Sequence, residues 1–302
     1  MTITRPTVVG IGEILWDVFP DGPQFGGAPA NFACTAAELA GGAMDVFAVG
    51  SVGRDELGTQ AVELLKSHGV DVSCVSTTDS PTGRVNVTLD AAGVPSFEIA
   101  TNTAWDNVPW SSDLTQLAAR ADAVCFGTLA QRSPVTRNTI RKFLAATRPD
   151  CLRILDINLR PPFWNEEVVG SSLQLASILK LNDTEVDVLL DQAGAGGADD
   201  ELLATLMKTF QLQLIAITRG SNGGTLLRAI GERSDQPSPP TKVVDTVGAG
   251  DAYTAALAIG LLNGAPLDDI NTWANRVASF VCTQAGGTPR FPAELRFAKK
   301  AK

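Results

Sequence analysis

The chain has 302 residues, enough to bury a full hydrophobic core in one large domain, or in one domain with a small appendage. Hydrophobic residues make up 44% of it and charged residues 19%, an ordinary globular composition. The net charge of −9 argues against nucleic acid or an anionic membrane as a partner, because both bind basic patches. A small phosphorylated ligand is still compatible, since backbone amides and one or two arginines suffice to bind it.

The cysteines and the single histidine restrict the possible chemistry. Five cysteines, far apart and without a C-x-x-C pair, predict reduced thiols in a reducing compartment. His68 is the only histidine, which excludes a multi-histidine zinc site, and Gly69 after it indicates a helix C-terminus. No run approaches 18 apolar residues and no signal-peptide pattern is present, so we expect a cytoplasmic protein without a transmembrane helix.

The first elements predict strands and an open loop. Residues 8–12 form an apolar strand pattern, and 13–19 alternate as a second strand with Asp17 on its polar face. Gly10-x-Gly12 does not continue into a dinucleotide-binding turn, because position 15 is leucine and no helix pattern follows. Two glycines and a proline at 26–29 then predict a loop that enters a helix ending near residue 40.

A change of character follows between residues 81 and 109. A strand at 46–49 and a helix at 55–68, capped by Asp55, precede it. Segments 84–90 and 95–99 predict two strands joined by a turn. Together with the strand at 13–19, they are expected to form a small separate sheet, contributed by about 13–25 and 82–107.

The rest of the chain alternates between strand and helix patterns. Strands are predicted at 123–127, 152–157, 178–181, 214–218, 224–228 and 242–246, and helices at 111–120, 134–147, 166–177, 184–191, 199–210, 251–263, 267–284 and 292–298. The loosest loops are 191–200 and 231–240. Such alternation predicts a mainly parallel sheet flanked by helices, a doubly wound α/β fold in a single domain spanning 1–302.

A small-residue turn at 248–250 stands between the strand predicted at 242–246 and a helix pattern. Gly248-Ala249-Gly250 should therefore lie at a helix N-terminus, where free backbone N–H groups and the helix dipole bind anions, phosphate above all. Asp251 follows in the first turn, as a helix-capping acid or as a general base beside a phosphate. No Gly-x-x-x-x-Gly-Lys-Ser/Thr pattern occurs, which excludes P-loop chemistry.

Three more polar motifs follow predicted strands, at the edge where open α/β sheets bind ligands. Arg160, after the strand at 152–157, is either a surface ion-pair partner or a phosphate clamp. Asn182 and Glu185 are either helix-capping residues or a site for Mg²⁺, which needs few protein carboxylates. Residues 218–224 by themselves predict a hairpin turn.

Three motifs in this order carry a family resemblance over essentially the whole chain. Asp245-Thr-Val-Gly-Ala-Gly-Asp251 closely resembles the C-terminal signature of the ribokinase-like, phosphofructokinase-B-type sugar kinases, with Tyr253 where Phe is more common. Gly26-Gly-Ala-Pro-Ala-Asn31 resembles their substrate-binding signature, in the version typical of fructokinases. Gly50-x-x-Gly-x-Asp-x-x-Gly58 matches the N-terminal signature.

The resemblance implies roles for individual residues of the sugar and phosphoryl sites. Asp251 is expected to be the catalytic base, and the amides of Gly248, Ala249 and Gly250 the anion hole. By this resemblance, the residues expected to bind the sugar are Asp17, Gly26, Gly27, Asn31, Arg160 and Asp251.

The resemblance also implies a nucleotide side of the cleft. ATP-binding positions are Asn182, Thr218, Gly220 and Gly223, with Asn275 and Ser279 flanking the adenine. Glu185 is expected to hold Mg²⁺ through water, and the loop at Asp245 to build a monovalent-cation site for K⁺. The small sheet would be a lid that closes over the sugar and mediates a homodimer.

The sequence therefore predicts an ATP-dependent sugar kinase that converts D-fructose to fructose 6-phosphate. Within the same class, 2-keto-3-deoxygluconate kinase, ribokinase and nucleoside kinase are alternatives. A non-catalytic sugar-sensing paralogue is an alternative from another class, and the intact Asp251 motif counts against it. A dinucleotide oxidoreductase is weakened by the failed glycine fingerprint.

Overall fold

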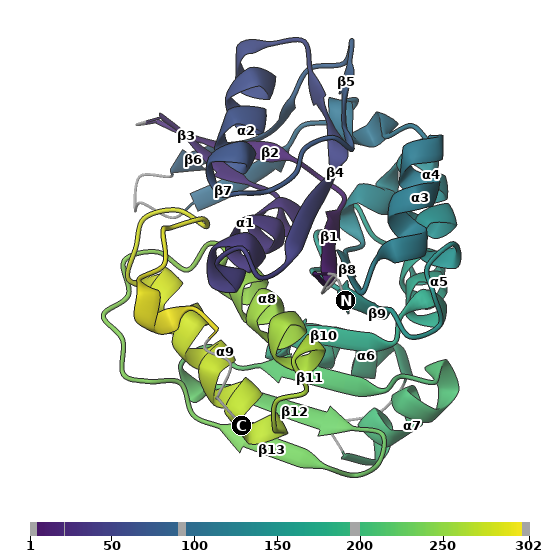
Figure 1. Ribbon diagram of the computed structural model, residues 1–302, viewed down its shortest axis with the longest axis vertical. Helices are drawn as coiled ribbons and strands as arrows, with labels where there is room; N and C mark the ends of the chain where they lie inside the picture. Colours follow the sequence, from purple (N-terminus) through teal and green to yellow (C-terminus); the bar gives the residue numbers. More distant parts are fainter. Residues whose placement is uncertain (1–4, 21, 90–94, 194–199, 298–302) are drawn as a thin grey trace.

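The protein is described here by a computed structural model that covers residues 5–20, 22–89, 95–193 and 200–297. Its larger sheet has nine strands in the order β13-β12-β11-β10-β9-β8-β1-β4-β5 (Figure 1). Their bounds are β1 Thr7–Ile11, β4 Asp45–Gly53, β5 Val75–Thr78, β8 Ala123–Phe126, β9 Leu152–Asp156, β10 Ile178–Asn182, β11 Leu214–Thr218, β12 Gly224–Arg228 and β13 Arg233–Gln236. Among these strands, the pairs β11–β12 and β12–β13 are antiparallel and the other pairs are parallel. The mainly parallel sheet expected from the sequence is therefore confirmed.

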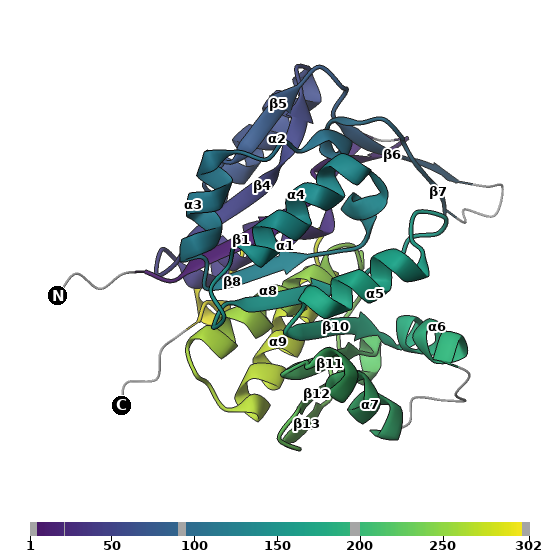
Figure 2. The same cartoon turned by 90° about the vertical axis from the view of Figure 1, so that its right-hand side faces the viewer.

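Helices cover both faces of this sheet (Figures 1 and 2). Their bounds are α1 Ala28–Ala40, α2 Glu56–Ser67, α3 Ser112–Arg120, α4 Pro134–Ala145, α5 Glu166–Leu175, α6 Asp183–Ala193, α7 Asp200–Phe210, α8 Ala249–Leu262 and α9 Leu267–Cys282. One apolar core includes side chains of α1, α8 and α9, and a second includes side chains of α3, α4, α5 and α7. Residues of β1 alternate between the two cores, Val8 in the first and Val9 in the second, as expected of a central strand buried on both sides.

The second sheet has four strands in the order β3-β2-β6-β7, with bounds β2 Leu15–Phe19, β3 Gly22–Gly26, β6 Gly83–Leu89 and β7 Pro95–Ile99. Figure 2 shows β6 and β7 extending beyond the main sheet. The small separate sheet expected from the sequence is therefore present. It begins after Glu13, which lies in the link between β1 and β2 rather than in a strand.

A hydrogen-bonded junction joins the two sheets. The carboxylate of Asp55, the N-cap of α2, accepts hydrogen bonds from the amides of Gly58 and Thr82 and from the hydroxyl of Thr82. That hydroxyl in turn accepts from the amide of Gly53 at the end of β4. Since Thr82 directly precedes β6, its hydroxyl fixes the start of the second sheet to the end of a main-sheet strand.

Two predicted elements near the C-terminus are wrong. Residues 242–246 form no strand, and the side chains of Val243 and Val244 are 58% and 63% exposed. The sheet edge is occupied instead by β13, which lies within 231–240, a segment predicted to be a loop. The helix predicted at 292–298 is a single 3₁₀ turn, Ala293–Leu295. The short edge strand β5 was not predicted.

The prediction for the helix that Asp55 caps is confirmed. The side chain of Asp55 caps α2, and His68 ends that helix. All five cysteines are free thiols. No helix in the described part of the chain has the length and apolar character needed to cross a membrane.

Candidate active site

The N-terminus of α8 forms an open cradle of backbone. Gly248 caps the helix in a left-handed conformation, with φ of 76° and no side-chain cap, and Ala249, Gly250 and Asp251 form the first turn. A Cβ atom at Gly248 would lie 2.5 Å from Cα of Gly287, so two glycine backbones touch here. The N–H of Ala249 donates to the carbonyl oxygen of Thr246 at 3.3 Å. The other N–H groups at the start of a helix lack intrahelical partners, which makes this turn suitable for an anion such as phosphate.

Asp251 faces α1 across this cradle. Its Oδ2 accepts a hydrogen bond of 2.9 Å from the side-chain amide of Asn31. Burial, together with the negative charge of Asp156, raises the pKa of Asp251 to about 6, against the opposing effect of Asn31. A carboxylate with such a pKa is ionised at neutral pH and still basic enough to accept a proton from a hydroxyl group.

The predicted sugar residues converge from β2, β3 and α1. A Cβ atom at Gly26 would lie 2.6 Å from Oδ2 of Asp17, and one at Gly27 would lie 2.5 Å from the carbonyl oxygen of Glu13. Burial raises the pKa of Asp17 to about 6, the charge of Arg160 opposes this shift, and the charge of Asp245 adds to it. Arg160 likewise lowers the pKa of Asp251, which places its guanidinium within electrostatic reach of both acids.

Three buried acceptor oxygens in this region have no hydrogen-bond partner among the described residues: Oε2 of Glu13, Oε1 of Gln24 and Oδ1 of Asn31. Buried polar atoms without partners are costly, so their presence indicates a ligand or water that donates hydrogen bonds. Glu13 and Gln24 were not predicted as site residues. An acid in an otherwise apolar segment next to a buried strand is the signal that could have identified Glu13.

A buried ion pair lies behind the cradle. Nζ of Lys180 donates to Oδ1 of Asp156 at 3.0 Å, and the hydroxyl of Thr254 in α8 donates to Oδ2 of Asp156 at 2.9 Å. The side chain of Lys180 is 7% exposed and that of Asp156 is 4% exposed. Lys180 was not predicted to belong to the site.

On the side of the cleft predicted to bind the nucleotide, β10 ends at Asn182 and α6 begins. Oδ1 of Asn182 accepts from the amide of Glu185, while the two carboxylate oxygens of Glu185 accept from the amides of Leu159 and Asn182. This reciprocal pattern is that of a capping box. Glu185 therefore also ties the start of α6 to the segment after β9.

The other predicted ATP-binding residues lie along β11, β12 and α9. Thr218 ends β11, and Gly220 and Gly223, with φ of 51° and 85°, form the turn into β12, which confirms the predicted hairpin. Asn275 and Ser279 are buried on α9. The side chain of Asn275 donates to the carbonyl oxygen of Asn271 within α9. The hydroxyl of Ser279 shares a hydrogen bond with that of Ser238, which holds the segment after β13 against α9.

Asp245 connects two loops beside the cradle. Its carboxylate accepts from the amide of Val247 at 3.0 Å and from the amide of Gly286 at 3.0 Å. The carboxylate thereby holds Gly248 and Gly287 in register. In the described ranges, no group of three or more His, Cys, Asp or Glu side chains is arranged to hold a metal ion alone.

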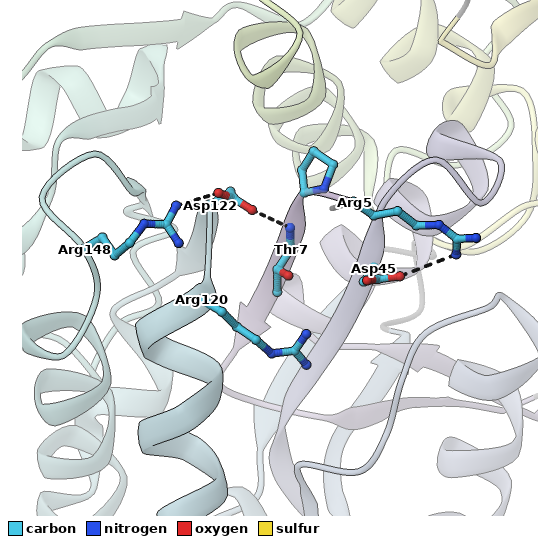
Figure 3. A pocket seen from close by; sticks show the side chains of 7 residues that line it. Arg5, Thr7, Asp45, Arg120, Asp122 and Arg148 are labelled. Carbon is cyan, nitrogen blue, oxygen red and sulfur yellow. Dashed lines mark hydrogen bonds and ion pairs between the residues drawn. The ribbon is translucent and has the colours of Figure 1, made fainter. Parts of the chain in front are cut away.

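A cavity of about 550 Å³ lies elsewhere, next to the N-terminal ends of β1, β4 and β8 (Figure 3). Arg148 pairs with Asp122, and Arg5 with Asp45. The guanidinium of Arg120 lies 4.6 Å from the ring centre of Phe47. Because ligands of open α/β sheets bind at the opposite, carboxyl ends of the strands, this cavity is separate from the candidate site.

Known proteins resemble this chain over nearly its whole length. The fructokinase-1 of Oryza sativa subsp. japonica is 30% identical over 319 residues, covering 97% of this chain and 96% of that protein. The crystal structure of an uncharacterized sugar kinase from Pyrococcus horikoshii in complex with ATP superposes with a TM-score of 0.77 at 28% identity, covering 93% of this chain and 94% of that one. A model described as "pfkB family carbohydrate kinase" matches residues 22–294. The chain thus belongs to the pfkB family of carbohydrate kinases.

Proposed function

We propose that this sugar kinase transfers the γ-phosphoryl group of ATP to the 6-hydroxyl of D-fructose. The observation that carries this proposal is the position of Asp251, in the first turn of α8, next to the Gly248–Gly250 cradle and hydrogen-bonded to Asn31 of the predicted sugar motif. A base and an anion-binding turn are thereby side by side, which is the arrangement that in-line phosphoryl transfer requires.

Asp251 is proposed to accept the proton of the attacking hydroxyl. Asn31 orients the carboxylate through Oδ2, so that Oδ1 is directed to the hydroxyl. The free amides of the α8 N-terminus stabilise the negative charge that spreads over the transferred phosphoryl oxygens. The small residues at 248–250 allow these oxygens to approach the backbone closely.

The unpartnered acceptors favour a neutral polyhydroxy substrate. Glu13, Gln24 and Asn31 each offer an acceptor oxygen, and Asp17 adds a carboxylate. Sugar hydroxyls donate hydrogen bonds to such groups. A sugar acid such as 2-keto-3-deoxygluconate would bring its own carboxylate close to Glu13, Asp17 and Asp251, with Arg160 as a single counter-charge. This balance supports fructose over the sugar acid.

The residues present fit the metal ions that the family resemblance implies. Each oxygen of Glu185 accepts one backbone N–H and retains a lone pair, which suits contact with a hydrated Mg²⁺ rather than direct coordination. When bound with ATP, Mg²⁺ neutralises phosphate charge. A K⁺ ion beside Asp245 would stabilise the two loops that form the cradle.

The substitution Asp251→Asn tests the catalytic assignment. It retains the hydrogen-bonding size of the side chain but removes the base, so we expect phosphoryl transfer to fall by about 10²–10⁴-fold. Sugar and ATP affinities, measured by calorimetry, should change little. In the wild type, activity should fall below about pH 6 as Asp251 becomes protonated. Asp113→Asn, at an exposed first-turn position of α3, is the matched control.

Coupled ADP release should be measured with fructose, ribose, 2-keto-3-deoxygluconate, glucose and adenosine, with Mg²⁺ and K⁺ present. Turnover confined to fructose is the expected result. Turnover with another sugar would keep the mechanism and reject the fructose assignment. Sugar binding without any turnover would indicate a sugar sensor, and substantial turnover by the Asp251→Asn variant would reject the base.

A further inference from the structure

Among the residues that the structure describes, a buried lysine beside the N-terminus of α8 has no role in the mechanism above. Lys180 lies in β10, and its side chain is 7% exposed. Burying an ammonium group is expensive, and replacing a buried ion pair with apolar residues is often neutral or stabilising. Stability alone is therefore a weak reason for a lysine at this position.

The geometry points to the site of phosphoryl transfer. Lys180 and Asp156 are register partners on the adjacent parallel strands β10 and β9, which sets their side chains next to each other. A Cβ atom built on Gly250 would lie 2.9 Å from Nζ of Lys180. The ammonium is thus directly behind the middle of the anion cradle, one residue before Asp251.

Hydrogen bonds through Asp156 hold the ammonium group of Lys180 in this place. Asp156 accepts from Nζ of Lys180 through one oxygen and from the hydroxyl of Thr254 through the other. The same hydroxyl lies 3.0 Å from the carbonyl oxygen of Gly250, so its single hydrogen is shared between Asp156 and Gly250. The ion pair and the first turn of α8 therefore form one hydrogen-bonded unit, and Lys180 cannot move away without breaking it.

We propose that Lys180 is a positioning residue that holds a fixed positive charge behind Gly250, and that this charge acts through the first turn of α8 on the transferred phosphoryl group and on Asp251. This inference rests on the proposed kinase function. A preorganised charge at a site with little water contributes to the transition state without a reorganisation cost. The absence of a Cβ atom at Gly250 is what lets this charge approach the cradle.

Five charged or titratable groups surround Asp251. Cys125, Asp156 and Lys180 lie on the strands β8, β9 and β10, and Glu13 and Arg160 lie in the segments after β1 and β9. Asp156 raises the pKa of Asp251, while Lys180 and Arg160 lower it. Asp156 and Lys180 thus act on Asp251 with opposite signs, and single substitutions of the two should shift the acidic limb of the pH–rate profile in opposite directions.

The test compares Lys180→Met with Asp156→Asn. We expect the acidic limb of kcat/KM to move to higher pH in Lys180→Met and to lower pH in Asp156→Asn. At a pH above both limbs, kcat of Lys180→Met should still be about 10- to 100-fold below wild type, with an unchanged KM for sugar. A purely structural ion pair would lower stability in both variants without opposite limb shifts. If the acidic limbs of the two variants do not shift in opposite directions, the proposal is overturned.

Nucleotide binding gives a readout that needs no turnover. Calorimetry with ATP and with ADP should show that Lys180→Met loses most of the preference for ATP, because the lysine acts on the terminal phosphoryl group. If the wild type binds ATP but phosphorylates no sugar, the proposed function fails, while this comparison still decides the role of Lys180. An unchanged preference for ATP would contradict it.

Lys180→Met leaves Asp156 as an unpaired buried charge and so endangers folding. The double variant Lys180→Met, Asp156→Asn removes both charges and retains an acceptor for Thr254. In this folded variant we expect the reduced kcat and the lost ATP preference to persist. If kcat and the preference for ATP both equal the wild-type values, the ammonium of Lys180 contributes nothing to phosphoryl transfer.

Discussion

At the scale of single residues, Glu13 is a buried carboxyl group whose charged form the protein stabilises only in part. It is 2% exposed, and its Oε2 has no partner in the described part of the chain. Burial, with a contribution from the charge of Asp251, raises the pKa of Glu13 from 4.5 to about 7. A carboxyl group whose pKa is raised by folding favours the folded state at low pH, and that contribution is lost as pH rises from about 4.5 to about 7.

The substitution Glu13→Gln should therefore stabilise the protein above neutral pH. The difference in pKa corresponds to an upper limit of about 3 kcal/mol in the free energy of unfolding at pH 8, and to almost none at pH 4. Urea unfolding at both pH values measures it, with Glu63→Gln, exposed on α2, as the control. Equal stability of variant and wild type at pH 8 would contradict the assignment of a buried, unneutralised carboxyl group.

At the scale of elements, α1, α2 and the segment after α9 meet at the carboxylate of Glu38. Oε1 of Glu38 is 3.1 Å from Nδ1 of His68, and it accepts a hydrogen bond from Arg290, which also donates to the hydroxyl of Ser67. Burial lowers the pKa of His68, the charge of Arg290 lowers it further, and Glu38 opposes both effects. The neutral imidazole is therefore the favoured form in the folded state.

His68 should make the protein less stable in mild acid. Because its pKa is lowered by folding, the unfolded chain takes up the proton first, and stability falls as pH decreases through the ordinary histidine range near 6.5. We expect the free energy of unfolding of wild type to fall more steeply from pH 7.5 to pH 5.5 than that of His68→Asn. Parallel slopes for the two proteins would rule out this linkage.

The elements that sequence patterns predicted well are those with local signals. Helix starts such as Asp55 before α2 depend on contacts three residues away, and the strands of the parallel core are mostly apolar. The edge of the sheet has no such signal. Val243 and Val244 have the residue preference of a strand, but β13 occupies that edge, and a preference without a partner strand forms no sheet.

The site was predictable where a motif is continuous in the sequence and not where it arises between strands. Gly248 to Asp251 form one turn, so their place at a helix N-terminus follows from the pattern alone. Lys180 and Asp156 meet only because β9 and β10 pair in one register, and that register is a property of the whole sheet.

At the scale of the whole molecule, Thr82 links the two sheets. Its buried hydroxyl donates to Asp55 and accepts from Gly53. Thr82→Val keeps the shape of the side chain but leaves both partners without this hydroxyl, so the free energy of unfolding should fall by about 2 kcal/mol. Hydrogen exchange should increase at β6 more than at β10. The matched control is Thr59→Val, which alters an exposed hydroxyl bonded to the backbone of Asp55. An equal increase in hydrogen exchange at β6 and β10 would refute a local link.

The edges of the main sheet limit how these molecules can associate. Both edge strands, β5 and β13, have four residues, and on β13 Arg233 pairs with Asp235 and Asp200. Short, charged edges are poor templates for an incoming strand, so they guard against fibre-like, edge-to-edge growth of the folded protein. The smaller sheet keeps the five-residue outer strands β3 and β7. The smaller sheet therefore has the longer unpaired edges of the two sheets.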